Sequence, residues 1–241
     1  MSLEVTRDRF LGGRVIADQP KHGFRAGHDT VLLAAAVPAG AGDQVLELGS
    51  GAGIASLCLA HRVPGVTVLG LEIDAELVRI ANANAGLNSM SHRARFETAD
   101  IVTFRHTQIF HHVFFNPPFH PDTGQASPEP SRDRAKRDAD DAITRWTRVA
   151  LALTKEGGTV TAILRADRVG EMLMEAAGAR VIVLPLIPKP GLMPKRSIVR
   201  IVKGQHGGLV HAPGLTLHEV DGRNTEAAEA VLRHGQALPF A

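Results

Sequence analysis

Short apolar runs rich in β-branched residues alternate with segments of helical periodicity through most of this chain. Such runs predict buried strands, and their alternation with helices predicts parallel strands joined by crossover helices. The expected fold class is therefore α/β with a doubly wound, mostly parallel sheet. The expected strands are Gln44–Leu48, Val66–Leu71, Arg95–Thr98, His112–Phe115, Thr159–Leu164 and Arg180–Leu184, and the expected helices are Gly53–Arg62, Ala75–Ala85 and Asp141–Leu153.

Segments at both ends and one long loop fall outside this alternation. Residues 1–28 contain the pair Gly12-Gly13, which predicts a small hairpin, and a helix is expected over Asp29–Val37. Residues 119–138 form a loop rich in Pro, Ser and Arg, and a loop of this length inside a compact domain usually serves a function.

The C-terminal residues predict a second small addition. Leu209–His211 and Leu215–Val220 suggest a hairpin, and Thr225–Arg233 suggests a helix. A chain of 241 residues is long for one domain and short for two. We expect a single domain that consists of an N-terminal extension (1–40), a central core (41–204) and the C-terminal hairpin and helix (205–241).

A glycine cluster follows the first expected strand. Gly49, Gly51 and Gly53 come after Glu47 and lie between the strand and the next helix, where they permit a tight turn and close approach of a ligand. Their G-x-G-x-G spacing differs from the G-x-G-x-x-G of dinucleotide enzymes, which argues against an NAD site. The cluster predicts a pocket for another nucleotide-like cofactor.

Residues at the next two strand ends extend this prediction. Glu72 ends the second expected strand, where a carboxylate can accept hydrogen bonds from both ribose hydroxyls of a nucleotide. Ile73 offers an apolar surface to an adenine ring. Asp100, after the third strand, can accept a bond from the adenine amino group, or it is a turn residue. Asp74 is expected to cap the helix that begins at Ala75.

The fourth expected strand ends in Asn116-Pro117-Pro118-Phe119. The amino group of a base is a poor nucleophile, because its lone pair is delocalised into the ring. The Asn116 side-chain oxygen and the Pro117 carbonyl can accept its two N–H bonds, while two prolines fix the backbone. Phe119 can stack on the base, an interaction worth about 1–3 kcal/mol. The alternative is a Pro-Pro turn that ends a buried strand, with Phe119 in the core.

These segments together resemble the motif series of Rossmann-like, class I amino-methyltransferases that depend on S-adenosylmethionine (SAM). The segment Gly27-His28-Asp29-Thr30-Val31-Leu32-Leu33 resembles a short motif that precedes the first strand in one branch, the bacterial tRNA1(Val) adenine-N6 methyltransferases. The resemblance runs from about Phe24 to Val202.

The resemblance implies a fold, a cofactor and a reaction. The fold is a seven-stranded sheet whose last strand, here Ser197–Val202, is antiparallel. The reaction is methyl transfer to an exocyclic amino nitrogen, with adenine N6 in RNA, and tRNA in particular, as the favoured acceptor, held by Asn116 to Phe119. The cofactor is SAM, and its site comprises Gly27, Asp29, Glu47, Gly49, Gly51, Gly53, Glu72, Ile73, Asp100 and Asn116, of which Gly27 and Asp29 close over the methionine moiety.

Other acceptors stay open, because the clamp formed by Asn116 to Phe119 fits any planar amine. They are guanine N2 in ribosomal RNA, adenine in DNA, and a glutamine amide in a protein. Protein glutamine methylation usually comes with an added helical recognition domain, which we do not expect here. A non-catalytic SAM- or nucleic-acid-binding module is the remaining alternative, and the intact clamp argues against it. The sequence does not fix the oligomeric state.

Composition narrows these alternatives. The single cysteine, Cys58, lies in an apolar helical segment and is expected in the core, which disfavours cytosine-5 methyltransferases because these need a cysteine nucleophile. No apolar stretch approaches the roughly 18–20 residues that span a bilayer. No signal-peptide pattern opens the chain, so we expect a cytoplasmic protein without a membrane partner.

Charge points to a nucleic-acid partner. The formal net charge is only +2, but the stretch from Lys189 to Lys203 carries five basic residues and no acidic one. Lys189, Lys195 and Arg196 in this stretch are expected to contact RNA phosphates, and the alternative is a solvated basic loop.

Four histidines, His106, His111, His112 and His120, surround the clamp in the sequence. Adjacent side chains on a strand point to opposite faces, so His111 and His112 cannot chelate together and we expect no metal. His120, next to Phe119, is assigned to contact the phosphate or base of the substrate, and the alternative is a solvated loop histidine. Trp146 lies on an expected helix and is expected to be a core residue.

Overall fold

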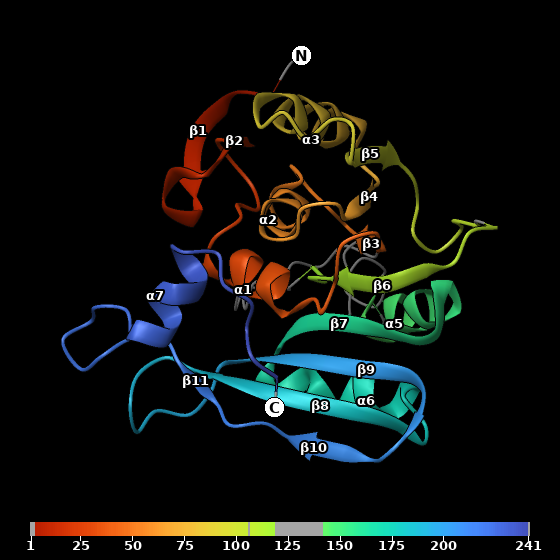
Figure 1. The fold of residues 1–241 in the computed structure, drawn as a ribbon, viewed down its shortest axis with the longest axis vertical. Helices are drawn as coiled ribbons and strands as arrows, with labels where there is room; N and C mark the ends of the chain where they lie inside the picture. Colours follow the sequence, from red (N-terminus) through yellow and green to blue (C-terminus); the bar gives the residue numbers. More distant parts are fainter. Residues whose placement is uncertain (1–2, 106, 119–141, 241) are drawn as a thin grey trace, which may run out of the picture.

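The computed structural model describes residues 3–105, 107–118 and 142–240. In this part of the chain, nine strands form one large sheet and two more form a hairpin beside it. Helices cover both faces of the large sheet (Figure 1). The predicted α/β fold class is confirmed.

The elements follow one another in the alternation that the sequence predicts. The hairpin and first helix are β1 (Val5–Phe10), β2 (Val15–Pro20) and α1 (His28–Ala36). The core continues with β3 (Gln44–Leu48), α2 (Ile54–Arg62), β4 (Thr67–Glu72), α3 (Ala75–Leu87), β5 (Ala94–Thr98), β6 (Phe110–Phe115), α5 (Ala142–Leu153), β7 (Thr154–Arg165), α6 (Val169–Glu175), β8 (Ala179–Ile187) and β9 (Arg196–His206). The chain ends with β10 (Leu209–His211), β11 (Leu215–Thr216) and α7 (Glu226–Leu232).

The strand order creates a crevice beside β3. The order is β10-β8-β9-β7-β6-β3-β4-β5, and β11 also pairs with β8. Strands β3 to β7 are parallel, whereas β9 is antiparallel to both β7 and β8. From β3 the chain proceeds to β4 on one side and later returns to β6 on the other. Open α/β sheets bind ligands at the carboxyl ends of strands at such a switch point.

The structure corrects the prediction for the C-terminal region. Ser197–Val202 lies in the antiparallel strand β9 as expected, but two further strands follow it. Leu209–His211 and Leu215–Thr216 do not form the predicted hairpin with each other, because each pairs in parallel with β8. Strand β8 would otherwise be the edge of the sheet, and its free backbone N–H and C=O groups are satisfied by these two short strands.

Two hydrophobic clusters hold the layers together. Helices α1, α2 and α3 and the hairpin pack on one face of the sheet, and α5 and α6 pack on the other (Figure 1). Strand β6 supplies both clusters, since Phe114 points into the first and Phe115 into the second, and both are fully buried. Apolar residues on both faces of a strand are typical of a sheet covered on both sides. Cys58 lies buried in the first cluster, as predicted.

The described helices contain no segment that is long and apolar enough to cross a membrane.

Candidate active site

A cavity of about 680 Å³ lies at the carboxyl ends of β3, β4, β5 and β6, within the range of ligand-binding pockets. Its wall also includes Phe24 and neighbouring residues of the segment between β2 and α1. The structure thus brings together most of the predicted site: Glu47, Gly49, Gly51, Glu72, Ile73, Asp100, Asn116, Pro117 and Pro118 all line this cavity. Phe119 and His120 lie outside the described residues.

The glycines of the turn after β3 serve different purposes. Gly51 has φ +53°, and a Cβ atom built on it would meet no atom within 4 Å, so a ligand can approach the backbone there. Gly53 is the N-cap of α2, and a Cβ atom on it would lie 2.6 Å from the Phe96 ring. Only Gly51 therefore leaves open space beside its Cα; Gly53 allows α2 to pack closely against β5.

Glu72 ties the end of β4 to this glycine turn. Its Oε2 atom accepts a hydrogen bond from the N–H of Gly51 at 2.9 Å. Its Oε1 atom accepts bonds from the N–H groups of Ile73 and Asp74, at 2.8 and 3.2 Å. A carboxylate offers about four lone-pair sites, so capacity remains for a ribose hydroxyl. Glu72 thus orders the turn as well as facing the cavity.

Ile73, Asp100 and Asp74 are the remaining predicted residues at this end of the cavity. Ile73 is 70% exposed, so its apolar surface is available to a ligand. Asp100 Oδ1 accepts the N–H of Val102 at 2.9 Å, the turn role expected as its alternative, while the residue still lines the cavity. The predicted cap is confirmed, because Asp74 Oδ1 accepts the N–H of Glu76 at 2.8 Å.

Glu47 is the buried carboxyl group of the cavity, with 4% of the residue exposed. The N–H group of Ser56 donates to Glu47 Oε2 at 3.1 Å, and the Ser56 hydroxyl donates to the same atom. Burial raises the pKa of Glu47 to about 8, and the negative charge of Glu72 acts in the same direction, against the two bonds from Ser56. Glu47 is therefore mostly protonated at pH 7, and a cation in the cavity would favour its charged form.

Asn116 follows the buried end of β6 and presents an unsatisfied acceptor. Its Oδ1 atom is buried and has no hydrogen-bond partner among the described residues. A buried acceptor without a partner costs about 1–3 kcal/mol, so an N–H group of a ligand is a suitable complement. Pro117 and Pro118 continue the same wall. Asn116 Oδ1 is thus available as one of the two acceptors that the predicted amine clamp needs.

Gly27 and Asp29 lie beside the cavity, and their neighbours Ala26 and Thr30 are in its wall. Gly27 is the N-cap of α1. The Asp29 carboxylate faces another partner, because Arg196 Nε donates to its Oδ2 atom at 3.2 Å.

The basic residues between Lys189 and Lys203 form two groups: some make contacts within the fold, and the others lie near the surface. Arg200 donates to the Ala36 carbonyl and stacks 3.8 Å from the centroid of the Phe240 ring. Lys203 Nζ donates to the carbonyl of Leu151 in α5 at 2.9 Å and to that of Thr154 at the start of β7 at 2.7 Å. These two cations therefore stabilise the fold. Lys189, Lys195 and Arg196 lie outside the cavity wall, in or next to the β8–β9 connection.

The histidine pair lies at the far end of β6 from the clamp, and its side chains share one partner. His111 Nε2 is 3.5 Å from Asp43 Oδ1, and His112 Nε2 is 3.3 Å from Asp43 Oδ2. Asp43 directly precedes the neighbouring strand β3, and its two carboxylate oxygens reach one ring each. Among the described residues, no three His, Cys, Asp or Glu side chains are grouped to hold a metal ion.

Sequence reasoning missed Trp146 as a site residue. It packs against the second hydrophobic cluster, in agreement with the core prediction, but it is partly buried and also lines the cavity. The spacing of apolar residues in α5 does not distinguish Trp146 from a purely structural aromatic residue.

Comparisons with known proteins agree with this geometry. The family described as "Methyltransferase small domain" matches residues 25–129. The chain is 31% identical over 184 residues to the tRNA1(Val) (adenine(37)-N6)-methyltransferase of Porphyromonas gingivalis, which covers 73% of this chain and 72% of the relative. It is 30% identical over 135 residues to the enzyme of that name from Cronobacter sakazakii, and this match spans 55% of each protein.

A solved structure shows the same fold. The crystal structure described as a predicted O-methyltransferase from Agrobacterium tumefaciens superposes with a TM-score of 0.73 and 24% identity, over 88% of this chain and 98% of that one. Fold, cavity and sequence relatives agree: the chain belongs to the class I SAM-dependent methyltransferases that carry the methyltransferase small domain.

Proposed function

We propose that this protein transfers the methyl group of SAM to the N6 amino nitrogen of an adenine in tRNA. The observation that carries the proposal is the buried Oδ1 atom of Asn116, which has no hydrogen-bond partner in the described part of the chain and lies in the same cavity as Glu47 and Glu72. An acceptor there suits an amino group, and it shares its cavity with residues suited to a nucleoside cofactor. The names of the sequence relatives support adenine and tRNA as the acceptor.

The residues of the cavity fit the cofactor. Glu72 and Ile73 suit a ribose and an adenine ring, and Asp100 lies in the same wall. Glu47 suits the amino group of the methionine moiety, because a cation beside a buried carboxyl group compensates its loss of solvent. When bound, SAM supplies a methyl group activated by the positive sulfur that carries it.

The clamp orients the acceptor. Asn116 Oδ1 and the Pro117 carbonyl accept the two N–H bonds of the target amine and direct its lone pair toward the methyl group. The nitrogen forms the new bond to the methyl carbon while the bond from that carbon to the sulfur breaks, and the sulfur keeps the electron pair and leaves as the neutral thioether of demethylated SAM. The excess proton of the nitrogen is then lost to water, so no general base is required. Two successive prolines hold the carbonyl in place before the substrate arrives, and such preorganised acceptors are a major source of rate enhancement. Phe119 and His120 are proposed to contact the base or its phosphate.

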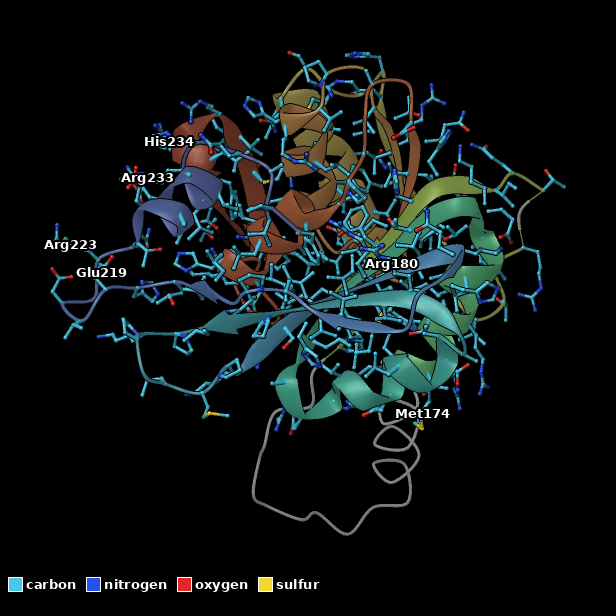
Figure 2. All side chains as sticks on the ribbon, turned by 60° about the horizontal axis from the view of Figure 1, so that its bottom comes forward. Met174, Arg180, Glu219, Arg223, Arg233 and His234 are labelled. Atoms are coloured by element: carbon cyan, nitrogen blue, oxygen red, sulfur yellow. The ribbon has the colours of Figure 1, made fainter. Side chains whose placement is uncertain are left out.

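We assign the RNA-docking surface to the β8–β9 connection. Strand β8 runs parallel to β7, so this connection lies at the carboxyl edge of the sheet, as does the cavity. Lys195 is exposed on it, and Arg196 follows at the start of β9. Lys189 Nζ donates to the Val220 carbonyl at 3.2 Å, which links the connection to the projecting turn that carries Glu219 and Arg223 (Figure 2).

The three parts of the chain have distinct tasks in this proposal. Residues 41–204 form the catalytic core. The extension over 1–40 supplies part of the cavity wall, including Phe24. Residues 205–240 cover the edge of β8 and pack against α1, where Leu238 N–H donates to the Ala35 carbonyl at 2.9 Å.

The test is methyl transfer with purified components. The protein is incubated with tritiated SAM and, in parallel, with total tRNA, ribosomal RNA, DNA and protein from a strain that lacks its gene. The labelled fraction is then digested to nucleosides or amino acids. We expect label in N6-methyladenosine from tRNA, and an initial rate of labelling lower by about 100-fold or more with the Asn116→Ala variant. Label in N2-methylguanosine, or confined to another fraction, would refute the assigned acceptor.

A further inference from the structure

The ring of Trp146, the only tryptophan in the chain, lies between the glycine turn and the end of β6. Its centroid is 5.9 Å from that of Phe115, with an angle of 73° between the rings. This edge-to-face packing is a preferred aromatic geometry. Phe115 directly precedes Asn116, so one side of Trp146 supports the strand end that carries the proposed acceptor.

The other side of Trp146 touches the glycine turn. A Cβ atom on Gly49 would lie 2.6 Å from Trp146 Cη2 and 3.0 Å from Cζ3, so no side chain fits there while the indole is present. The same turn leaves open space at Gly51. Two glycines of one turn thus have different neighbours: Gly51 leaves room for a ligand, whereas Gly49 contacts Trp146.

Helix α5 holds the indole in this place. Ile143 and Thr147, which flank Trp146 on the helix, are buried to 1% and 0% exposure. The Thr147 hydroxyl donates to the Ile143 carbonyl at 2.6 Å. The large, planar indole is therefore mounted on a packed element and not on a loop.

We infer that Trp146 is a positioning residue for methyl transfer, a rigid spacer that fixes how the glycine turn at Gly49 and the acceptor at Asn116 lie where they leave the paired strands β3 and β6. The inference rests on the proposed function of Asn116. A displacement of reacting groups by about 1 Å can lower a rate roughly 100-fold. A spacer between the cofactor turn and the acceptor therefore controls the rate of transfer more than the affinity for either ligand.

The first test separates positioning from stability. Trp146→Phe keeps an aromatic ring but removes the outer part of the indole that touches Gly49. We expect its single-turnover rate to fall by about 10-fold or more, with the Kd of S-adenosylhomocysteine (the demethylated product of SAM) within about twofold of wild type. The matched control is Leu151→Ala, because Leu151 is partly buried on the same helix and packs on the same cluster. This control should lower the Tm and leave the single-turnover rate unchanged.

The second test needs no RNA. Gly49→Ala places a methyl group against the indole and should weaken binding of S-adenosylhomocysteine, measured by calorimetry. The double variant Gly49→Ala/Trp146→Phe makes room for that methyl group but keeps the backbone strain of alanine at φ +68°, so it should recover only part of the affinity. If the wild-type protein methylated no tRNA, the proposed function would fail. The non-additive effect of the two substitutions on S-adenosylhomocysteine affinity would still show whether Trp146 fixes the conformation of the glycine turn. A wild-type rate in Trp146→Phe, or additive effects in the double variant, would overturn the inference.

Discussion

Arg196 Nε donates a hydrogen bond to Asp29 Oδ2 at 3.2 Å, and this contact joins the start of β9 to the first turn of α1. The sequence assigns these residues to different ligands, Asp29 to the methionine moiety of SAM and Arg196 to RNA phosphates. Both side chains are about a third exposed, so the ion pair contributes at most about 1 kcal/mol to stability. Its main consequence is structural: it links the edge of the cofactor cavity to the proposed RNA-docking surface.

Glu72 has two tasks, and removing its carboxylate should disturb both. Glu72→Ala loses the proposed ribose acceptor and the bond that orders Gly51. We expect the affinity for S-adenosylhomocysteine to fall by about 1.5–3 kcal/mol, as for other hydrogen bonds to charged groups. Isothermal titration calorimetry measures this change, and Glu97→Ala on the neighbouring strand β5 is the control for loss of an exposed carboxylate. Unchanged affinity in Glu72→Ala would place the ribose contact elsewhere.

Asn116 should affect turnover without affecting cofactor binding. We expect Asn116→Ala to lower the methylation rate by about 100-fold or more, the range for loss of a preorganised catalytic hydrogen-bond partner. Its Tm should stay the same or rise, because the variant removes a buried oxygen that no residue of 3–105, 107–118 or 142–240 hydrogen-bonds. A lower Tm combined with a normal rate would reduce the Asn-Pro-Pro segment to a structural turn.

The sequence predicts which residues at the strand ends lie together in the cavity, for a physical reason. Glu47, Glu72 and Asp100 are far apart along the chain, but each stands at or near the carboxyl end of a parallel strand, and such ends meet at one edge of the sheet. The glycine turn can also be predicted, because Gly49, Gly51 and Gly53 are close together in the sequence. These predictions need only strand order and polarity, which the alternating pattern supplies.

What the sequence does not predict depends on packing between distant segments. Arg200 and Lys203 look like part of a basic surface, yet each donates to carbonyl groups of other elements. Trp146 looks like any core aromatic residue, and only the structure shows its contact with Gly49. The C-terminal strands were expected to pair with each other, because the sequence does not show that β8 has a free edge. None of these contacts produces a periodic pattern in the sequence from which it could be predicted.

Glu47 should couple cofactor binding to proton release. Its pKa in the folded protein, about 8, lies above its ordinary value of 4.5, so the buried carboxyl holds a proton at pH 7. The positive amino group of SAM or S-adenosylhomocysteine beside it would lower that pKa and expel the proton. We therefore expect affinity to rise with pH up to about 8. Calorimetry at pH 7 in buffers of different ionisation enthalpy should detect release of up to about one proton.

The control for this prediction is Glu47→Gln, which has nothing to titrate and should release no proton. Glu47 should also make the free energy of unfolding depend on pH, in the direction opposite to that of a carboxylate whose pKa is lowered on folding. The folded state holds more protons than the unfolded state between pH 4.5 and about 8, so the contribution of Glu47 to stability is lost as pH rises through this window. The Tm of wild type should thus fall more steeply over this range than that of Glu47→Gln. Equal slopes would show that Glu47 is already ionised.

The RNA-docking surface predicts a specific salt dependence. Lys189 and Lys195 flank the β8–β9 connection at the carboxyl edge, whereas Arg196 is already paired with Asp29. The double variant Lys189→Ala/Lys195→Ala should weaken tRNA binding and reduce the slope of log K against log[salt] by up to about two phosphate contacts. The target base must leave its stack to reach Asn116, at a cost of a few kcal/mol, and phosphate contacts offset this cost.

A matched pair of cations lies at the opposite edge of the sheet. Lys155 and Arg180 stand near the amino ends of β7 and β8, and Figure 2 shows Arg180 far from the turn with Glu219 and Arg223. Lys155→Ala/Arg180→Ala removes the same charge, so a general electrostatic effect would weaken tRNA binding equally in both variants. We expect the wild-type salt slope in this control and wild-type affinity for S-adenosylhomocysteine in both. An unaltered slope in Lys189→Ala/Lys195→Ala would mean that RNA docks on another face.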